Sequence, residues 1–332
     1  MTTNILLLCG GDGSEHSISL ISAQYIADRL RADPDFNVLT AVMHNHRFIV
    51  EDTLSGYFDD EWNFVYAKNK MRIDCVVPCL HGAPGETGEI QSLLKIYGIP
   101  YIGCDAEASS NCFNKITTKL YLDALGIPNS PYCIIPLKNE YYKQLSLDFF
   151  DKYQDIYVKA ASQGSSVGCY HVTKRSDVWD SIVEAFSFST EVLLEKNIKH
   201  RELEVAAYEI DGELKITRPG EIIIPENQFY TYEEKYSKTS GTITTVTPSN
   251  LDEECIERIR DYARRAFIGL KLRDLSRIDF FFSEDDGILI NEINTFPGAT
   301  PISMFPKMLE HNGDTMTDFL SKAVKRAIKM KF

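Results

Sequence analysis

The chain has 332 residues, a length at which two or three packed lobes are expected rather than a single core. Apolar residues make up 44% and charged residues 25%, which is typical of a globular protein and excludes a disordered one. A formal net charge of -13 disfavours nucleic acid as a partner, because most of the surface would repel phosphate. The apolar run at residues 5–9 is far shorter than a membrane span or a signal-peptide core, so we expect no membrane association and a cytoplasmic location.

Eight cysteines stand at positions 9, 75, 79, 104, 112, 133, 169 and 255, without a CxxC pair. This spacing favours buried reduced thiols over zinc ligands or disulfides.

Short apolar runs alternate with segments of helical period over the first hundred residues, which predicts a parallel sheet wrapped by helices. Strands are predicted at 4–9, 74–79 and 101–104, and helices at 14–30 and 90–97. The first helix follows a turn that contains Gly10, Gly11 and Gly13. A loop at 81–88 leads into the second helix.

The pattern in the middle of the chain predicts a small α+β lobe. It has a helix at 106–125, strands at 132–135 and 156–160, a short strand that ends at 172, and a helix from 176. Further strands are predicted at 191–195, 202–210, 220–224 and 242–247, followed by a helix at 252–270, a hairpin and a terminal helix. Residues 225–241 show no clear period, and a loop of that length is typical of a lid. We therefore expect three lobes, 1–104, 105–190 and 191–332, of mixed α/β and α+β class with an N-terminal doubly wound parallel sheet.

The hairpin over 277–294 carries the strongest chemical signal in the sequence. If its strands pair symmetrically about the turn 284–287, Asp279 faces Glu292 and Arg277 faces Asn294, and all four side chains share one face. Only an odd-length loop or a bulge would break this pairing. Opposed carboxylates repel unless a cation lies between them, and these oxygen ligands suit Mg²⁺. The hairpin therefore predicts a metal site; the alternative is a solvated acidic face with Arg277 as its counter-ion.

A second signal is Lys159, at the end of a predicted strand, followed by small residues at 162–168. Backbone N–H groups in such a loop can approach a phosphate closely while the lysine neutralises its charge. A plain glycine-rich turn explains the same pattern equally well. Lys115 and Glu15, taken alone, are typical of a surface lysine and of an acidic residue that favours a helix N-terminus.

Longer motifs match a known family. GGDGSEHSISL at 10–20 and HGAPGETGEIQ at 81–91 resemble the N-terminal motifs of D-alanine:D-alanine ligases, members of the ATP-grasp superfamily. Similar matches follow in family order at Lys159, at GSSVG (164–168), EK (195–196), RE (201–202), FY (229–230), KY (235–236), RID (277–279) and NEINTFPG (291–298). The resemblance covers nearly the whole chain.

The resemblance implies a three-lobed ATP-grasp fold with ATP held between the central and C-terminal lobes. The metal ligands would be Asp279, Glu292 and Asn294, holding two Mg²⁺ ions, with Mn²⁺ as a substitute. The implied ATP contacts are Lys115, Lys159, Ser166, Glu195, Lys196, Ile198, Glu202 and Lys235.

The same resemblance implies formation of D-alanyl-D-alanine through a D-alanyl phosphate, for peptidoglycan precursor synthesis, by a homodimer. Glu15 would bind the ammonium of the first amino acid and form a hydrogen-bonded chain with Ser165 and Tyr236. Ser303 and Met304 would bind the carboxylate of the second. Arg277 and the Gly298 N–H would stabilise the oxyanion of the tetrahedral intermediate.

The sequence departs from the family pattern at Gly13, Thr87 and the pair Phe113-Asn114, where Ser, Asp and Met-Asp are usual. None of these positions supplies an implied magnesium or phosphate ligand.

Other functions remain as alternatives. The second substrate could be D-serine or D-lactate, although Tyr236 favours an amine nucleophile. A nucleotide-binding regulatory module without turnover is disfavoured by the intact set on the hairpin. A dinucleotide-dependent oxidoreductase is disfavoured because the turn at 10–13 lacks the GxGxxG spacing.

Overall fold

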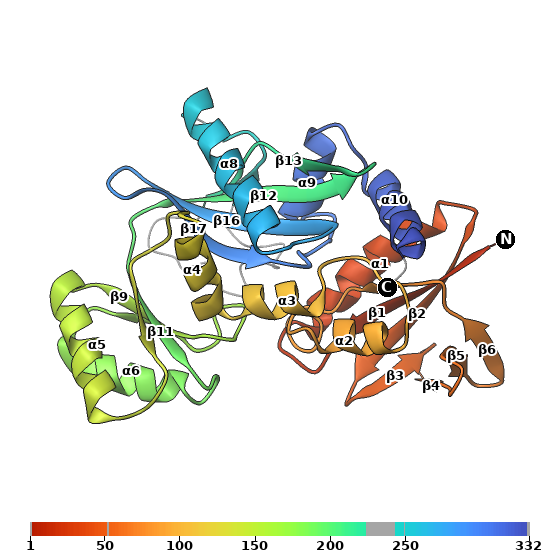
Figure 1. The fold of residues 1–332 in the computed structure, drawn as a ribbon, viewed down its shortest axis with the longest axis horizontal. Coiled ribbons are helices and arrows are strands. Elements are labelled where there is room, and N and C mark those ends of the chain that lie inside the picture. The colour runs from red at the N-terminus through yellow and green to blue at the C-terminus, as the bar shows by residue number, and fades with distance from the viewer. Residues whose placement is uncertain (1, 52, 224–242, 249, 331–332) are drawn as a thin grey trace.

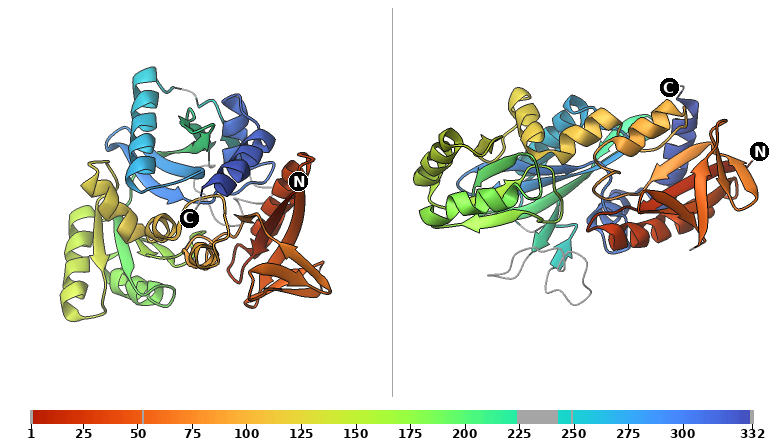
Figure 2. Two further views of the ribbon diagram at one scale, coloured as in Figure 1. Left: turned by 45° about the vertical axis from the view of Figure 1, so that its right-hand side comes forward. Right: turned by 90° about the horizontal axis from the view of Figure 1, so that it is seen from below.

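The fold is that of a computed structural model, which describes residues 2–51, 53–223, 243–248 and 250–330 (Figure 1). Its described strands form sheets of seven, four and six strands, with helices packed on each. This arrangement confirms the mixed α/β and α+β class. The N-terminal lobe (red) and the lobe of the four-stranded sheet (yellow-green) lie at opposite ends of the molecule, with the six-stranded sheet between them (Figure 2). The predicted lid at 225–241, with Lys235 and Tyr236, lies outside the described residues.

The seven-stranded sheet has the order β6-β5-β4-β3-β2-β1-β7. Only β2, β1 and β7 are parallel; the rest form an antiparallel meander at 47–72 that the sequence pattern did not reveal. Strand β1 is buried along most of its length, which explains its continuous apolar run. The elements are β1 (Thr3–Gly10), α1 (His16–Arg31), β2 (Phe36–His44), β3 (Arg47–Val50), β4 (Leu54–Phe58), β5 (Asn63–Tyr66), β6 (Asn69–Arg72), β7 (Cys75–Pro78) and α2 (Glu89–Ile96).

Two predicted elements between residues 101 and 125 are wrong. The expected strand at 101–104 is a single bridge between Val76 and Tyr101, because Gly103 turns with φ +93° and Asp105 then caps the next helix. The expected single helix is two helices, α3 (Ala106–Phe113) and α4 (Lys115–Ala124). Asn114 separates them: its backbone is extended, and its side chain accepts a hydrogen bond from the Thr117 N–H at 3.0 Å.

The four-stranded sheet has the order β10-β9-β11-β8. Its last strand in the chain, β11, pairs with β8 and β9, so this sheet extends to Lys196, beyond the predicted boundary at residue 190. Helices α5 and α6 cover it (Figure 1), and α5 was not predicted. The elements are β8 (Tyr132–Ile135), α5 (Glu140–Tyr153), β9 (Ile156–Ala160), β10 (Cys169–Val172), a 3-10 turn (Arg175–Asp177), α6 (Val178–Ala185) and β11 (Val192–Lys196).

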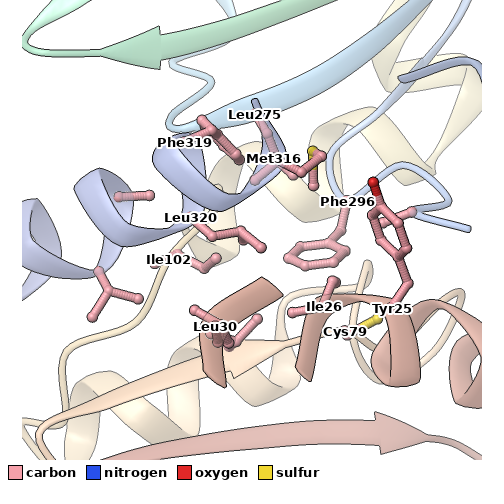
Figure 3. Packing of buried hydrophobic residues seen from close by; sticks show 14 of the residues in the cluster. Tyr25, Ile26, Leu30, Cys79, Ile102, Leu275, Phe296, Met316, Phe319 and Leu320 are labelled. Atoms are coloured by element: carbon pink, nitrogen blue, oxygen red, sulfur yellow. The ribbon is translucent and has the colours of Figure 1, made fainter. Parts of the chain in front are cut away.

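The six-stranded sheet has the order β15-β14-β12-β16-β17, with β13 beside β12. Its elements are β12 (Arg201–Ile210), β13 (Glu213–Ile216), β14 (Gly220–Ile223), β15 (Ile243–Thr245), α8 (Glu253–Gly269), β16 (Leu275–Ser283), β17 (Gly287–Asn294), α9 (Met304–His311) and α10 (Met316–Lys329). Helices α9 and α10 share a hydrophobic cluster with α1, in which Phe319 and Leu320 face Ile26 and Leu30 (Figure 3). The first and last lobes are therefore held together by a common core.

The eight cysteines are free thiols, as predicted; five are buried and three are partly buried. Among the described residues, no helix combines the length and the apolar composition needed to cross a membrane.

Candidate active site

A cavity of about 430 Å³ lies where the three lobes meet. The N-terminal lobe contributes Glu15, the four-stranded lobe contributes Ser165, and the hairpin of β16 and β17 contributes Arg277. The predicted site residues that line this cavity are Glu15, Lys115, Ser165, Arg277, Glu292, Asn294, Gly298, Ser303 and Met304. Residues distant in sequence therefore surround one space.

The hairpin has the predicted pairing, Arg277 with Asn294 and Asp279 with Glu292, but not the predicted turn. Ser283 pairs with Gly287, so the loop has an odd number of residues and shifts the register by one. A bulge between Asp279 and Phe280 shifts it back, because Asn291 has no partner opposite it. The two register shifts cancel, so Arg277 still pairs with Asn294 and Asp279 with Glu292.

Arg277 is held between two buried carboxylates. Its guanidinium donates to both oxygens of Asp279 at 2.7 Å and lies 3.1 Å from Glu204 on β12. Asp279 and Glu204 are each 2% exposed. Burial would lower the pKa of Arg277, but the two carboxylates outweigh it and raise the pKa, so the guanidinium stays charged. Glu204 was not predicted, because a single acidic residue within a strand carries no distinguishing pattern.

Two of the three predicted metal ligands line the cavity, and the third, Asp279, does not. Glu292 and Asn294 line the cavity and offer oxygen ligands of the kind that Mg²⁺ prefers. Asp279 lies behind them, bound by Arg277 and by the Asn294 amide nitrogen at 3.1 Å. A metal ion at Asp279 would have to share or replace one of these bonds. Of the alternative interpretation, a solvated acidic face with Arg277 as counter-ion, the structure has the counter-ion, whereas Asp279 itself is buried.

Glu15 lies at the start of α1, where the chain leaves β1 through Gly10 and Gly11 with positive φ. The Ser165 hydroxyl donates to Glu15 Oε1 at 2.7 Å. A Cβ at Gly164 would lie 3.1 Å from Glu15 Oε2, so only glycine leaves this oxygen uncrowded. The predicted contact between Glu15 and Ser165 is thus present, and the third member, Tyr236, is outside the described residues.

The two predicted phosphate lysines have different surroundings. Lys115, at the start of α4, donates to the Gln163 carbonyl at 2.6 Å and lies 4.0 Å from Glu292 Oε2. Lys159, on β9, pairs with Glu195 on β11 and does not line the cavity.

Other predicted ATP contacts also lie outside the lining of this cavity; these are Ser166, Glu195, Lys196, Ile198 and Glu202. Most of them lie on β11, on β12 and on the segment that joins these strands, where Lys196 pairs with Asp286 at 2.6 Å. Glu195 belongs to the four-stranded sheet and Glu202 to the six-stranded sheet. This set therefore marks the junction between two lobes, beside the cavity.

His81 and Glu86, in the loop after β7, line the cavity although the sequence assigned them no role. Glu86 Oε2 accepts the Gly82 N–H at 2.7 Å. Burial, followed by the neighbouring charge of Glu15, raises the pKa of Glu86 to about 8. Burial lowers the pKa of His81, whose Nε2 lies 3.2 Å from Ser22 Oγ. Both residues lie within the motif at 81–91, which is the sequence signal that could have identified them.

Replacing Glu86 by Gln should change the pH dependence of stability. Because the folded-state pKa of Glu86 lies above the ordinary 4.5, the unfolded chain loses this proton at a lower pH than the folded chain does, so the stability that the protonated carboxyl contributes is lost as pH rises from 4.5 towards 8. We expect the free energy of unfolding of Glu86→Gln, relative to the parent chain, to rise by roughly 1 to 3 kcal/mol between pH 5 and 8. Urea unfolding at several pH values measures this. The exposed Glu213→Gln is the control, and equal pH profiles for both variants would contradict the raised pKa.

Comparisons with known proteins identify the family. Residues 4–104 match the model of the D-ala D-ala ligase N-terminus, and residues 121–325 match that of the D-ala D-ala ligase C-terminus. The D-alanine--D-alanine ligase of Vibrio atlanticus is 51% identical over 98% of this chain and 99% of its own length. The crystal structure of D-alanyl-alanine synthetase A from Vibrio cholerae superposes with a TM-score of 0.94 at 51% identity, covering 98% of both chains.

A more distant structure is similar in fold. The VanG D-Ala:D-Ser ligase from Enterococcus faecalis has a TM-score of 0.85 at 25% identity and covers 98% of this chain and 99% of its own. The family matches span both ends of the chain, and their shared architecture is the ATP-grasp fold expected from the sequence motifs. This chain belongs to the D-Ala-D-Ala ligase family.

Proposed function

We propose that this chain joins two D-alanine molecules into D-alanyl-D-alanine, with cleavage of ATP to ADP and phosphate, to supply a peptidoglycan precursor. The observation that carries the proposal is the cavity itself. It brings a carboxylate, Glu15, and two cations, Lys115 and Arg277, around one space. That combination suits a zwitterionic amino acid next to a phosphate.

The first D-alanine would be held by its ammonium at Glu15. The hydrogen bond from Ser165 fixes one carboxylate oxygen of Glu15 and leaves Oε2 facing Gly164 and Gly82. The carboxylate of this substrate would then point away from Glu15, towards the lysine side of the cavity. There one carboxylate oxygen would attack the γ-phosphorus of ATP, forming a D-alanyl phosphate as ADP leaves.

ATP would lie between the four-stranded and six-stranded lobes. Lys115, Lys159, Ser166 and Lys235 would contact its phosphates, Glu195, Lys196 and Ile198 its adenine, and Glu202 its ribose. Asp279, Glu292 and Asn294 would hold two Mg²⁺ ions, or Mn²⁺, which offset phosphate charge when bound.

The second D-alanine would be oriented by its carboxylate at the start of α9. Ser303 is the N-cap of this helix and makes no side-chain capping bond to it, so the first N–H groups, including that of Met304, can receive an anion. The neutral amine would attack the carbonyl carbon of the acyl phosphate, Arg277 with the Gly298 N–H would stabilise the oxyanion, and the intermediate would collapse with loss of phosphate and of the amine proton. The proposed lid, with Tyr236, would exclude water from this intermediate.

Phosphate release from ATP, measured with magnesium and each of D-alanine, D-serine, D-lactate and L-alanine, tests the proposed function. We expect release with D-alanine alone, with one dipeptide formed per phosphate. Release that requires D-serine or D-lactate as a second substrate would identify the alternative ligase. The 51% identity to D-alanine--D-alanine ligases, against 25% to the D-Ala:D-Ser ligase, favours the dipeptide of D-alanine.

Lys159→Ala should weaken ATP binding more than D-alanine binding, because it removes a proposed phosphate contact and no amino-acid contact. A charge-assisted contact contributes about 1.5 to 3 kcal/mol, so we expect the Kd for ATP to rise by roughly 10- to 150-fold. Calorimetry with ATP measures the affinity, and the exposed Lys152→Ala in the same lobe is the control. Unchanged nucleotide affinity would contradict the phosphate role.

We also propose a cytoplasmic location, which the eight free thiols support. The homodimer implied by the family resemblance stays a prediction, which light scattering at micromolar protein concentration can check.

A further inference from the structure

Lys119, on α4, is 2% exposed, which is unusual for a lysine. It lies one helical turn after Lys115, and its ammonium has three acceptors: Glu195 Oε1 at 2.5 Å, Asn129 Oδ1 at 3.2 Å and the Ser130 carbonyl at 3.2 Å. An ammonium has three N–H donors, so this set satisfies it completely. Lys119 is therefore fixed in place.

Glu195 lies between Lys119 and Lys159. One of its oxygens pairs with each lysine, and the carboxylate is 3% exposed. Burial alone would raise the pKa of Glu195, but the two ammonium groups outweigh burial and lower it to about 2. The carboxylate is thus held ionised by two lysines, although burial also lowers the pKa of Lys119, a shift that the charge of Glu195 opposes.

The two lysines differ in what else holds them. The Lys159 side chain is 16% exposed, and Lys159 lies one residue before the end of β9, next to the small-residue loop. The Lys119 side chain is 2% exposed and has two acceptors besides Glu195. If Lys159 turns towards a phosphate, Glu195 loses one partner. A buried carboxylate without a partner is strongly unfavourable, so a second, fixed cation must remain beside it.

We propose that Lys119 is a positioning residue for ATP, holding Glu195 ionised and oriented so that Lys159 is free to move from Glu195 to the nucleotide phosphates. Without Lys119, Lys159 would be the remaining charge partner of Glu195 and would be retained by it. The proposal rests on the function proposed above, since it assumes that ATP binds beside Lys159.

The test is ATP binding by calorimetry, with steady-state kinetics, in the full chain carrying Lys119→Met. We expect the Kd and KM for ATP to rise by about tenfold or more, because a buried pair is broken. The KM for D-alanine should change less than about twofold, and kcat at saturating ATP should fall less than the KM rises. Lys152→Met, the same change at an exposed site of the same lobe, should have no effect.

A double variant separates positioning from folding. Lys119→Met with Glu195→Gln removes both buried charges, a change that buried ion pairs commonly tolerate. With Glu195 neutral, Lys159 is no longer retained, so the double variant should bind ATP within about threefold of Glu195→Gln alone. A loss of affinity from Lys119→Met that is equally large in both backgrounds, or wild-type affinity in Lys119→Met, would overturn the proposal.

The comparison with Lys159→Ala keeps the two proposals apart. If the parent chain binds no ATP, the proposed function fails. If the parent binds ATP and Lys159→Ala weakens binding while Lys119→Met does not, only the positioning role of Lys119 fails.

Discussion

Glu292→Gln is expected to abolish ligation while the chain stays folded. Glu292 lines the cavity opposite Asp279 and 4.0 Å from Lys115, so its charge acts on the space where phosphate and metal would meet. Loss of one carboxylate from a site that has to balance a triphosphate and divalent ions removes several kcal/mol of transition-state stabilisation. We therefore expect kcat to fall by about a thousandfold or more.

The measurement is dipeptide formation at saturating ATP and D-alanine, with thermal unfolding of the same samples. Glu284→Gln is the matched control, because it makes the same change at an exposed position in the turn of the same hairpin. A folded Glu292→Gln variant with undiminished turnover would remove Glu292 from the proposed metal site.

Arg277→Met is expected to give the largest loss of stability. It leaves two carboxylates, Asp279 and Glu204, that are both 2% exposed and lose their shared guanidinium. Breaking a buried charge pair by removing one partner costs about 3–5 kcal/mol. We expect the free energy of unfolding to fall by that amount, and ligation to be lost because the proposed oxyanion contact is lost.

Urea unfolding measures the change. The control is Arg218→Met, which breaks a bidentate ion pair with Glu253. The side chains of Arg218 and Glu253 are 49% and 72% exposed, and such a surface pair contributes about 0–1 kcal/mol. Adding Glu204→Gln to Arg277→Met should recover part of the lost stability, since it removes one of the two buried charges that lost the guanidinium. Equal losses for Arg277→Met and Arg218→Met would show that burial of the site charges is not important for stability.

Several features of the protein follow from the sequence alone, because they depend on local patterns. The alternation of residues along a strand places Arg277 and Asp279 on one face, and the loop motif after Lys159 forms where the spacing predicted. Helix α8, which has a clear apolar face, lies within one residue of its predicted bounds at each end. The family motifs supplied the roles, including that of Glu15, which local patterns could not.

Where local preferences compete, the sequence pattern was insufficient. The apolar period across 106–125 predicts one helix, yet Asn114 breaks it because its side chain caps the following turn. The hairpin turn has an odd length that a bulge at Asn291 compensates, and strand alternation alone cannot reveal a pair of cancelling shifts. The predicted lobe boundary at residue 190 separates β11 from the sheet to which it belongs. Strand pairing joins segments that are far apart in the chain, so the local pattern does not reveal it.

Tertiary structure alone decided the electrostatics of the site. From its sequence context, Lys119 is typical of a surface lysine on a helix. Only in the folded structure does Glu195, on a strand distant in sequence, lie beside its ammonium. Glu204 becomes the second partner of Arg277 only through the pairing of β12 with β16, and Glu86 acquires its raised pKa only where the fold buries it beside Glu15. The physical reason is common to all three: side-chain type is local, but burial of a charge and the partner that compensates it are set by segments far apart in the chain.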